Sequence, residues 1–400
     1  MRVSIFFYDF AHYHAARCRA LWERLRSAGG EALIYALREQ APDRPDQGYH
    51  SLLRGKVRLL GEGSAPASSM RTVGKLLSAL NHDLPDAVAI PGYSSWPCLA
   101  ALAWCKVRGR LAVLLSESQR RDFQRYPWRE WLKGQMVRRF DAALVGGRPH
   151  LAYVRELGLP ERVIFTGYDV VDNRFWQEEA DRARKRGNRR RRPAWPERYF
   201  LAVQRFIPEK NLEGLLQAYS RYRSRARAAA WHLVICGSGL LEGRVRALVG
   251  ELNLAGQVHL PGYQKAEALA GWYGLAGCLI HASFREPWGL VVNEAMAAGL
   301  PVLVSQNCGC AADLVHEGVN GFTFDPGDLK GLAGLMAKMS SKEVDLQAMG
   351  QASRMIIGGW TPQTFAETLL QALEAGKAVR PGCNYFPSSP QPSPPRGGRG

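Results

Sequence analysis

Residues 278–305 have the sequence CLIHASFREPWGLVVNEAMAAGLPVLVS. The apolar run Cys278–His281 predicts a buried strand, the apolar stretch after Gly289 predicts a helix, and Pro301–Ser305 predicts a second strand. Pro287 and Gly289 mark a tight loop between the first strand and the helix. Strand, helix and strand in this order form one unit of a parallel sheet that is covered by helices.

The same alternation extends through most of the chain. In the C-terminal half it predicts further strands at Tyr199–Gln204, Trp231–Cys236 and Val258–Leu260, helices that begin at Asn211 and Leu240, and later helices at Leu329–Met339 and Pro362–Ala375. In the N-terminal half it predicts strands at Val3–Phe7, Ala32–Leu37, Lys56–Leu60, Ala87–Pro91, Leu111–Leu115, Ala142–Val145 and Val163–Thr166, with helices at Arg17–Ser27, Arg71–Leu80, Pro97–Val107 and Trp128–Arg139. Because 400 residues exceed one ordinary hydrophobic core, we expect two doubly wound α/β domains.

Composition changes mark the expected boundaries. The chain becomes charged and poor in apolar residues after position 173, and its last residues are rich in Pro, Gly, Ser and Arg. We therefore expect an N-terminal domain at 1–173, a charged linker at 174–197, a second domain at 198–360, a closing helix at 361–378 and a disordered tail at 379–400.

Charge and cysteine content narrow the functional class without naming it. The formal charge of +17 suits nucleic acid, an anionic membrane surface or phosphorylated small molecules. No apolar stretch reaches the roughly 20 residues of a membrane-spanning helix, and the chain has no signal-peptide pattern. The eight cysteines are scattered and lack metal-ligand spacing, so we expect reduced thiols in a cytoplasmic protein without a bound metal.

Two cations lie on one strand-to-helix loop in the second domain. Arg205 follows the predicted strand directly, and Lys210 stands at the entrance of the next helix. A phosphate chain bound there would contact both side chains and the helix N-terminus. The alternative is that Arg205 pairs with Glu209 and that Lys210 is only solvated.

Two carboxylates follow another strand of the same domain. Glu286 lies in the loop and Glu294 more than a turn inside the next helix, so both can face one cleft. Together with the cations they suit a ligand that carries hydroxyls and phosphates. Alternatively, Glu286 is an acid favoured by the helix dipole and Glu294 is a structural helix residue.

These loops resemble the retaining glycosyltransferases of family 4, strongly so over Tyr199–Asp328. The resemblance implies the GT-B fold, in which two Rossmann-like domains face each other across a cleft. It also implies that Arg205 and Lys210 contact the diphosphate of a nucleotide sugar. By the same resemblance Glu286 holds hydroxyls of the donor sugar, and Glu294 holds the ribose.

Further donor-side positions are implied by this resemblance. The backbone of Gly289 and Leu290 would contact the phosphate, and Gly237 and Tyr263 lie in loops that resemble the family's nucleotide-side and base-side loops. Trp288 stands where the family more often has phenylalanine. We expect that change to alter packing more than chemistry.

The N-terminal domain departs from the family pattern. The first strand-to-helix loop lacks the usual glycine pair and instead makes His12, Tyr13 and His14 candidates for the acceptor side, although capping or core roles explain these histidines equally well. Ser116 and Glu117 stand where relatives often have histidine. Glu117 would form a hydrogen bond with the acceptor or stabilise positive charge at the anomeric carbon. Alternatively, it is an acid favoured at a helix N-terminus.

The segment Pro127–Phe140 combines aromatic and basic residues. Trp128, Trp131, Leu132, Gln135 and Phe140 fall near one helical face, with cations elsewhere. Such a helix can lie on an anionic membrane, or it can cover the sheet with its charges in water. The sequence leaves both interpretations open.

We therefore expect a metal-independent glycosyltransferase that needs no cofactor and retains the anomeric configuration. Its catalytic residues would be Glu286, Arg205, Lys210 and Glu117. Its acceptor would be a glycan, a lipid-linked molecule or a small molecule, in the setting of cell-envelope polysaccharide synthesis. An epimerase or phosphorylase of the same fold is the alternative enzyme, and a nucleic-acid-binding protein is the alternative from another class.

Overall fold

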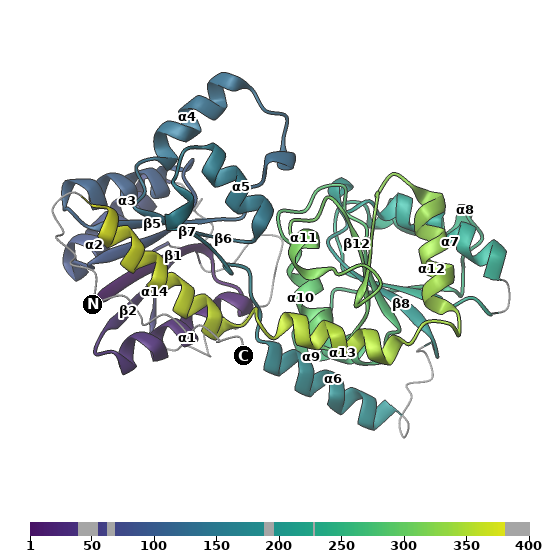
Figure 1. The fold of residues 1–400 in the computed structure, drawn as a ribbon. Coiled ribbons are helices and arrows are strands. Elements are labelled where there is room, and N and C mark those ends of the chain that lie inside the picture. Colours follow the sequence, from purple (N-terminus) through teal and green to yellow (C-terminus); the bar gives the residue numbers. More distant parts are fainter. Residues whose placement is uncertain (39–54, 62–68, 188–195, 227–228, 381–400) are drawn as a thin grey trace, which may run out of the picture.

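The computed structural model describes residues 1–38, 55–61, 69–187, 196–226 and 229–380 (Figure 1). The first sheet contains β1 (Arg2–Asp9), β2 (Glu31–Arg38), β3 (Val57–Leu59), β4 (Ala87–Pro91), β5 (Leu111–Ser116), β6 (Ala142–Val145) and β7 (Ile164–Thr166). Its strand order is β3-β2-β1-β4-β5-β6-β7 and its neighbouring strands are parallel. The helices of this domain are α1 (His12–Ser27), α2 (Met70–Asp83), α3 (Trp96–Val107), α4 (Pro127–Val137) and α5 (Arg148–Glu156), with the short 3₁₀ turns η2 (Arg120–Asp122) and η3 (Glu161–Val163).

The second sheet is also parallel and has the order β10-β9-β8-β11-β12-β13. Its strands are β8 (Tyr199–Val203), β9 (His232–Cys236), β10 (Val258–Gly262), β11 (Cys278–His281), β12 (Val302–Ser305) and β13 (Gly321–Phe324). Its other elements are α6 (Asn173–Gly187), η4 (Pro208–Lys210), α7 (Leu212–Ala226), α8 (Glu242–Glu251), α9 (Ala266–Leu275), α10 (Leu290–Ala297), α11 (Ala311–Leu314), α12 (Leu329–Ser340), α13 (Leu346–Ile357) and α14 (Pro362–Val379).

Burial explains why the apolar runs form central strands. Every residue of β5, β6, β11 and β12 is buried, because helices cover both faces of a doubly wound sheet. The expected α/β architecture of two Rossmann-like domains is therefore confirmed. Ligands of such sheets bind beyond the carboxyl ends of the strands, and the strand order decides which loops meet there.

The chain crosses between the domains twice. The segment expected as a charged linker begins with α6, whose Trp176 belongs to the core of the second domain and whose helix packs on α9. At the other end, α14 returns to the first domain and packs on α1, with Phe365 and Leu369 in the first core. Figure 1 shows α14, in yellow, running across the first domain.

Several expected elements differ from the observed ones. The first helix begins at His12 rather than Arg17, and α4 ends at Val137, so Phe140 lies beyond the helix. The apolar pattern of the sequence did not predict α5, α9, α13 and β13, which are short or have small residues that weaken the apolar period. Part of the expected linker and nearly all of the expected tail, at 188–195 and 381–400, lie outside the described residues.

Two further properties concern the described residues alone. Each cysteine among them is a buried free thiol. None of their helices combines the length and apolar character needed to cross a lipid bilayer.

Candidate functional site

Loops from two neighbouring strands meet at the carboxyl edge of the second sheet. β8 leads into the loop that carries Arg205 and η4, and β11 leads into the loop that carries Glu286. β8 pairs directly with β11, which brings the two loops together although about 80 residues separate them in sequence. The backbone N–H groups of Phe284 and Arg285 both donate to the carbonyl of Glu209, so the two loops are hydrogen-bonded to each other.

Glu286 is held by two cationic or hydrogen-bonding partners. The ammonium group of Lys210 forms an ion pair with its Oε2, and His281 Nε2 lies 2.8 Å from the same oxygen. Burial by itself opposes ionisation, but the hydrogen bond from His281 and the charge of Lys210 overcome it and lower the pKa of Glu286 to about 2. Lys210 is therefore buried and paired, which contradicts the alternative that it is only solvated.

Arg205 is exposed on the same loop as Lys210. Glu209, the partner considered for it, accepts a hydrogen bond from Arg285 Nη2 at 2.7 Å. The two cations named by the sequence thus stand on one loop, with Lys210 inside the protein and Arg205 at its surface.

Gly289 opens the helix that follows Glu286. Its φ of 104° is in the left-handed region, and a Cβ there would lie 3.4–3.5 Å from Glu286, His281 and Cys310. α10 begins at the next residue, Leu290, so the N-terminus of this helix follows directly on the loop that carries Glu286. This is a site at which an anionic group gains hydrogen bonds and a favourable dipole.

Glu294 lies deeper in the protein than Glu286. It is 5% exposed, and the hydroxyl of Tyr273 donates to its Oε2 at 2.9 Å. Burial, together with this carboxylate, raises the pKa of Tyr273 far above its ordinary value. Glu294 is therefore a buried hydrogen-bonded acid one turn along α10.

The remaining donor-side candidates lie along the same sheet edge. Gly237 follows β9 with a φ of 143°, and a Cβ there would collide with the carbonyl oxygen of Gln204 at 1.9 Å, so only glycine lets these loops pack. Tyr263 follows β10 and is 47% exposed. Trp288 is 1% exposed and donates from Nε1 to Asn293 Oδ1 at 2.8 Å, so its indole is part of the packed interior.

The N-terminal candidates have mostly local partners. His14 Nδ1 accepts from the backbone N–H of Ala11 at 3.1 Å, and its ring stacks on Phe7 with centroids 4.1 Å apart. Ser116 is buried and accepts from the N–H of Ser118 at 3.2 Å. These contacts favour the capping and core roles. The side chain of His12 lies outside the described residues, although α1 begins there.

Glu117 adjoins a buried ionic cluster that was not predicted from the sequence. Arg17 and Asp169 are both fully buried, with Arg17 Nη2 3.3 Å from Asp169 Oδ1. The guanidinium also lies over the rings of Tyr13 and Tyr168. Burial and the nearby Glu117 raise the pKa of Asp169 against the effect of Arg17. The one sign of this cluster in the sequence was the charged residue Arg17 within the apolar face of a predicted helix.

Contacts between the domains surround the Glu286 loop. Gln119 Nε2 donates to the backbone oxygen of Glu286 at 3.0 Å, and His150 Nε2 lies 2.8 Å from the backbone oxygen of Pro287. Arg148 donates from its backbone N–H and its Nε to Asp313, at 3.0 Å each. The first domain therefore fixes the main chain of the loop whose side chain is the candidate acid.

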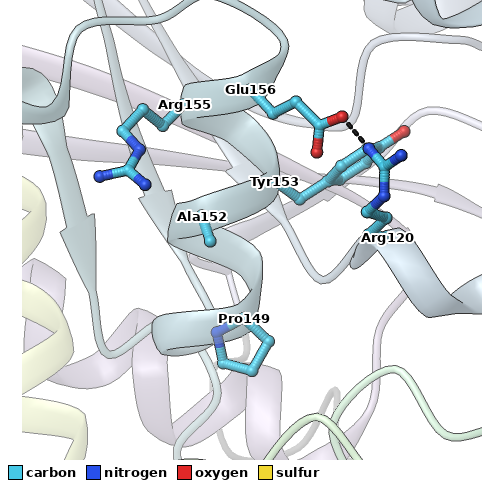
Figure 2. A pocket seen from close by; sticks show the side chains of 6 residues that line it. All are labelled: Arg120, Pro149, Ala152, Tyr153, Arg155 and Glu156. Atoms are coloured by element: carbon cyan, nitrogen blue, oxygen red, sulfur yellow. Dashed lines mark hydrogen bonds and ion pairs between the residues drawn. The ribbon is translucent and has the colours of Figure 1, made fainter.

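Two pockets adjoin this junction. One of about 250 Å³ lies between the domains and is lined by Gln119, Arg120, Arg121, Pro149, Gln306, Cys308 and Ala312. The other, of about 370 Å³, lies along α5 (Figure 2). Figure 2 shows Arg120 pointing toward its ion-pair partner Glu156, whereas Arg155 points to the opposite side of the helix.

The aromatic side chains of α4 lie on the surface. Trp128 is 60% exposed, Trp131 63% and Leu132 45%. Gly134 and Val137 are the buried residues of α4, while Phe140 is buried in the first core. Gln135 is half-buried. The apolar residues therefore do not form the single continuous face that the sequence suggested, because the helix ends before Phe140.

The described residues contain no cluster of three or more His, Cys, Asp or Glu side chains that could hold a metal ion.

The second domain is similar to known glycosyltransferases. Residues 185–356 match the family model described as glycosyl transferases group 1. An uncharacterised glycosyltransferase of Methanocaldococcus jannaschii is 32% identical over 168 residues, which are 41% of this chain and 41% of that protein. Sucrose-phosphate synthase of Spinacia oleracea is 32% identical over 154 residues, 35% of this chain and 14% of the enzyme. The matches span less than half the length of these relatives.

Similarity of fold extends over nearly the whole chain. The crystal structure of HepE from Anabaena in complex with UDP-glucose has a TM-score of 0.72 and 15% identity, and the match covers 94% of this chain and 100% of HepE. At that identity the likeness concerns the fold alone. The protein accordingly has the GT-B fold, and its segment 185–356 matches the glycosyl transferases group 1 family.

Proposed function

We propose that the protein is a retaining glycosyltransferase of family 4 that moves a sugar from a nucleoside diphosphate to an acceptor hydroxyl. The observation that carries this proposal is the meeting of Lys210, Glu286 and the start of α10 at the carboxyl edge of the second sheet. A cation and a helix N-terminus suit a diphosphate, and a neighbouring ionised carboxylate suits sugar hydroxyls. In this proposal residues 198–360 bind the donor, residues 1–173 bind the acceptor, and the segments 174–197 and 361–378 join the two.

The proposed chemistry needs charge stabilisation rather than a protein nucleophile. Negative charge grows on the departing diphosphate, where Arg205 and Lys210 stabilise it. The leaving phosphate takes the acceptor proton while both groups lie on the same face of the sugar, which preserves the anomeric configuration. The reaction needs neither a metal nor a cofactor. Glu117, beside the buried Arg17 and Asp169, faces the acceptor side and steadies positive charge at the anomeric carbon.

Thermal unfolding with a panel of nucleoside diphosphates and their sugar conjugates tests the donor site. UDP and UDP-glucose are the first probes, because HepE was solved with UDP-glucose. A ligand at a hundred times its dissociation constant adds roughly 2.7 kcal/mol to stability. The stabilisation should disappear in Arg205→Ala, and Glu286→Ala should lose mainly the added effect of the sugar.

Arg246→Ala is the matched control for these variants, because Arg246 is exposed on α8 of the same domain and pairs with Glu242 on its own helix. It should bind like the wild type. A panel that shifts no transition in the wild type would refute the proposed donor site.

We further propose that α4 rests on an anionic membrane, which suits a glycan or lipid-linked acceptor in cell-envelope synthesis at the inner face of the membrane. Phe123, Tyr126, Trp128, Trp131 and Leu132 are exposed together. Arg129 lies over the rings of both Tyr126 and Trp128, so basic and aromatic groups share this surface. Each cation near an anionic bilayer contributes on the order of 1 kcal/mol, and the rings enter its interface.

Liposome flotation tests the membrane contact. The double variant Trp128→Ala/Trp131→Ala should bind vesicles that contain anionic lipid less than the wild type, and neither should bind neutral vesicles strongly. Trp96→Ala is the control, because Trp96 is 64% exposed but belongs to α3. Equal flotation of the wild type and the double variant would exclude α4 as the contact.

A further inference from the structure

A single carboxylate oxygen is shared by two donors at the candidate donor site. Lys210 Nζ and His281 Nε2 both approach Oε2 of Glu286. The side chains are 11%, 2% and 13% exposed for Lys210, His281 and Glu286. Ser283 Oγ lies 3.3 Å from the same imidazole nitrogen. His281 is thus the least exposed of these three side chains.

The geometry fixes what His281 does for this carboxylate. An ionised carboxylate only accepts hydrogen bonds, so the proton at the short contact belongs to His281 Nε2. His281 Nδ1 is buried and has no hydrogen-bond partner within the described part of the chain. His281 also ends β11, where it pairs with Val304 of β12, so the ring is anchored to the centre of the sheet. The imidazole is a rigid donor aimed at Glu286.

Lys210 holds the same oxygen in a different way. Its ammonium group has three donors on a flexible stem, and η4, which carries it, is a single 3₁₀ turn that is followed by Asn211 with a φ of 52°. A diphosphate carries more negative charge than one carboxylate, so it competes for this cation when it enters the loop. The site therefore contains one fixed partner and one exchangeable partner for Glu286.

We propose that His281 is the positioning residue of Glu286, and that Lys210 changes partner from Glu286 to the diphosphate when the donor binds. This inference rests on the proposed function. After the exchange His281 alone holds Oε2, which leaves the other oxygen of Glu286 directed at the sugar hydroxyls. A nucleotide without a sugar must break the Lys210–Glu286 pair and gains no replacement for it. A nucleotide sugar restores the lost interaction through its hydroxyls, so the site favours the complete donor over the bare diphosphate.

Titration calorimetry with UDP and UDP-glucose, or with the pair that the stability panel selects, tests both parts. His281→Ala should change the affinity for the bare nucleotide by less than about twofold and reduce the preference for the nucleotide sugar by about tenfold, which corresponds to about 1.4 kcal/mol. His281→Gln, whose amide can reach the same oxygen, should recover most of that preference. Glu286→Gln should bind the bare nucleotide at least about threefold more tightly, because Lys210 is released from its pair.

His316→Ala is the matched control, because His316 is exposed on the same domain. Equal losses for nucleotide and nucleotide sugar in His281→Ala, or no recovery in His281→Gln, would show that His281 is only structural. Weaker binding of the bare nucleotide by Glu286→Gln would overturn the exchange of Lys210.

Failure of the proposed function is separable from failure of this inference. If no nucleotide on the panel binds the wild type, the function is wrong, and acid unfolding then decides the role of His281 without a ligand. Because His281 helps to lower the pKa of Glu286, the stability of His281→Ala should fall less than that of the wild type as the pH drops from 6 to 3. An unchanged acid transition would overturn the positioning role.

Discussion

Replacing Gly147 with alanine adds one methyl group where the two domains touch. A Cβ at this position would lie 2.2 Å from Asp313 Oδ2 and 2.9 Å from Trp288 Cζ3. The backbone is extended at Gly147, with a φ of −155°, so alanine is excluded by space rather than by conformation. Asp313 can swing away only by giving up its hydrogen bonds from Arg148, and Trp288 is 1% exposed and packed.

The size of the effect follows from these contacts. Forcing a methyl group into a packed interior costs about 1–3 kcal/mol. Separation of the domains relieves the overlap completely, because Gly147 belongs to the first domain and both clashing side chains belong to the second. We therefore expect the ratio of closed to open molecules to fall by about 5-fold to 150-fold.

Sugar transfer and small-angle X-ray scattering measure this change together. Gly147→Ala should lower kcat/KM at least about fivefold and increase the radius of gyration, while binding of the nucleotide to the second domain changes less than about twofold. Gly243→Ala is the control, because a Cβ there meets nothing within 4 Å. Adding Asp313→Ala to Gly147→Ala should recover part of the activity by removing the shorter contact. Wild-type activity and scattering in Gly147→Ala would refute the role assigned to this junction.

Three further predictions concern stability. The pKa of Glu286 is lowered to about 2, so the ionised carboxylate stabilises the fold above its unfolded pKa of about 4.5. That contribution, about 3 kcal/mol, is lost as the pH falls toward 2. In urea unfolding between pH 6 and pH 3, the free energy of unfolding of Glu286→Gln should therefore depend less on pH than that of the wild type. Arg17→Met should lower the free energy of unfolding by about 3–5 kcal/mol, because it leaves the buried Asp169 without its cation. Adding Asp169→Asn to the same chain should recover part of that loss. Strictly additive losses of the two substitutions in urea unfolding would contradict the pairing. Asn211→Ala should lower the free energy of unfolding by about 2–4 kcal/mol, because Asn211 has a φ of 52° and its amide donates to two buried carbonyls. Asn211→Gly allows the same left-handed backbone conformation, so it should unfold at a higher temperature than the alanine variant.

The sequence predicted the central strands closely and the rest of each domain less well. β4, β6 and β11 have the expected bounds, because a buried parallel strand is a short continuous apolar run with turn residues beside it. α9 and α13 were missed, since glycine and alanine within them weaken the apolar period although tertiary packing still stabilises the helix. At the candidate site the sequence named Lys210 and Glu286 but gave no indication of His281.

Local pattern determined what this protein is built from. The alternation of apolar strands and amphipathic helices is a property of neighbouring residues, and it was sufficient to predict two doubly wound sheets and the loops that carry Arg205, Lys210 and Glu286. The tertiary structure decided which of these groups touch. Lys210 meets Glu286 because β8 and β11 are neighbours, and Arg17 meets Asp169 across 152 residues. Such contacts depend on the order of strands in the sheet and on how the domains close, neither of which a local pattern contains.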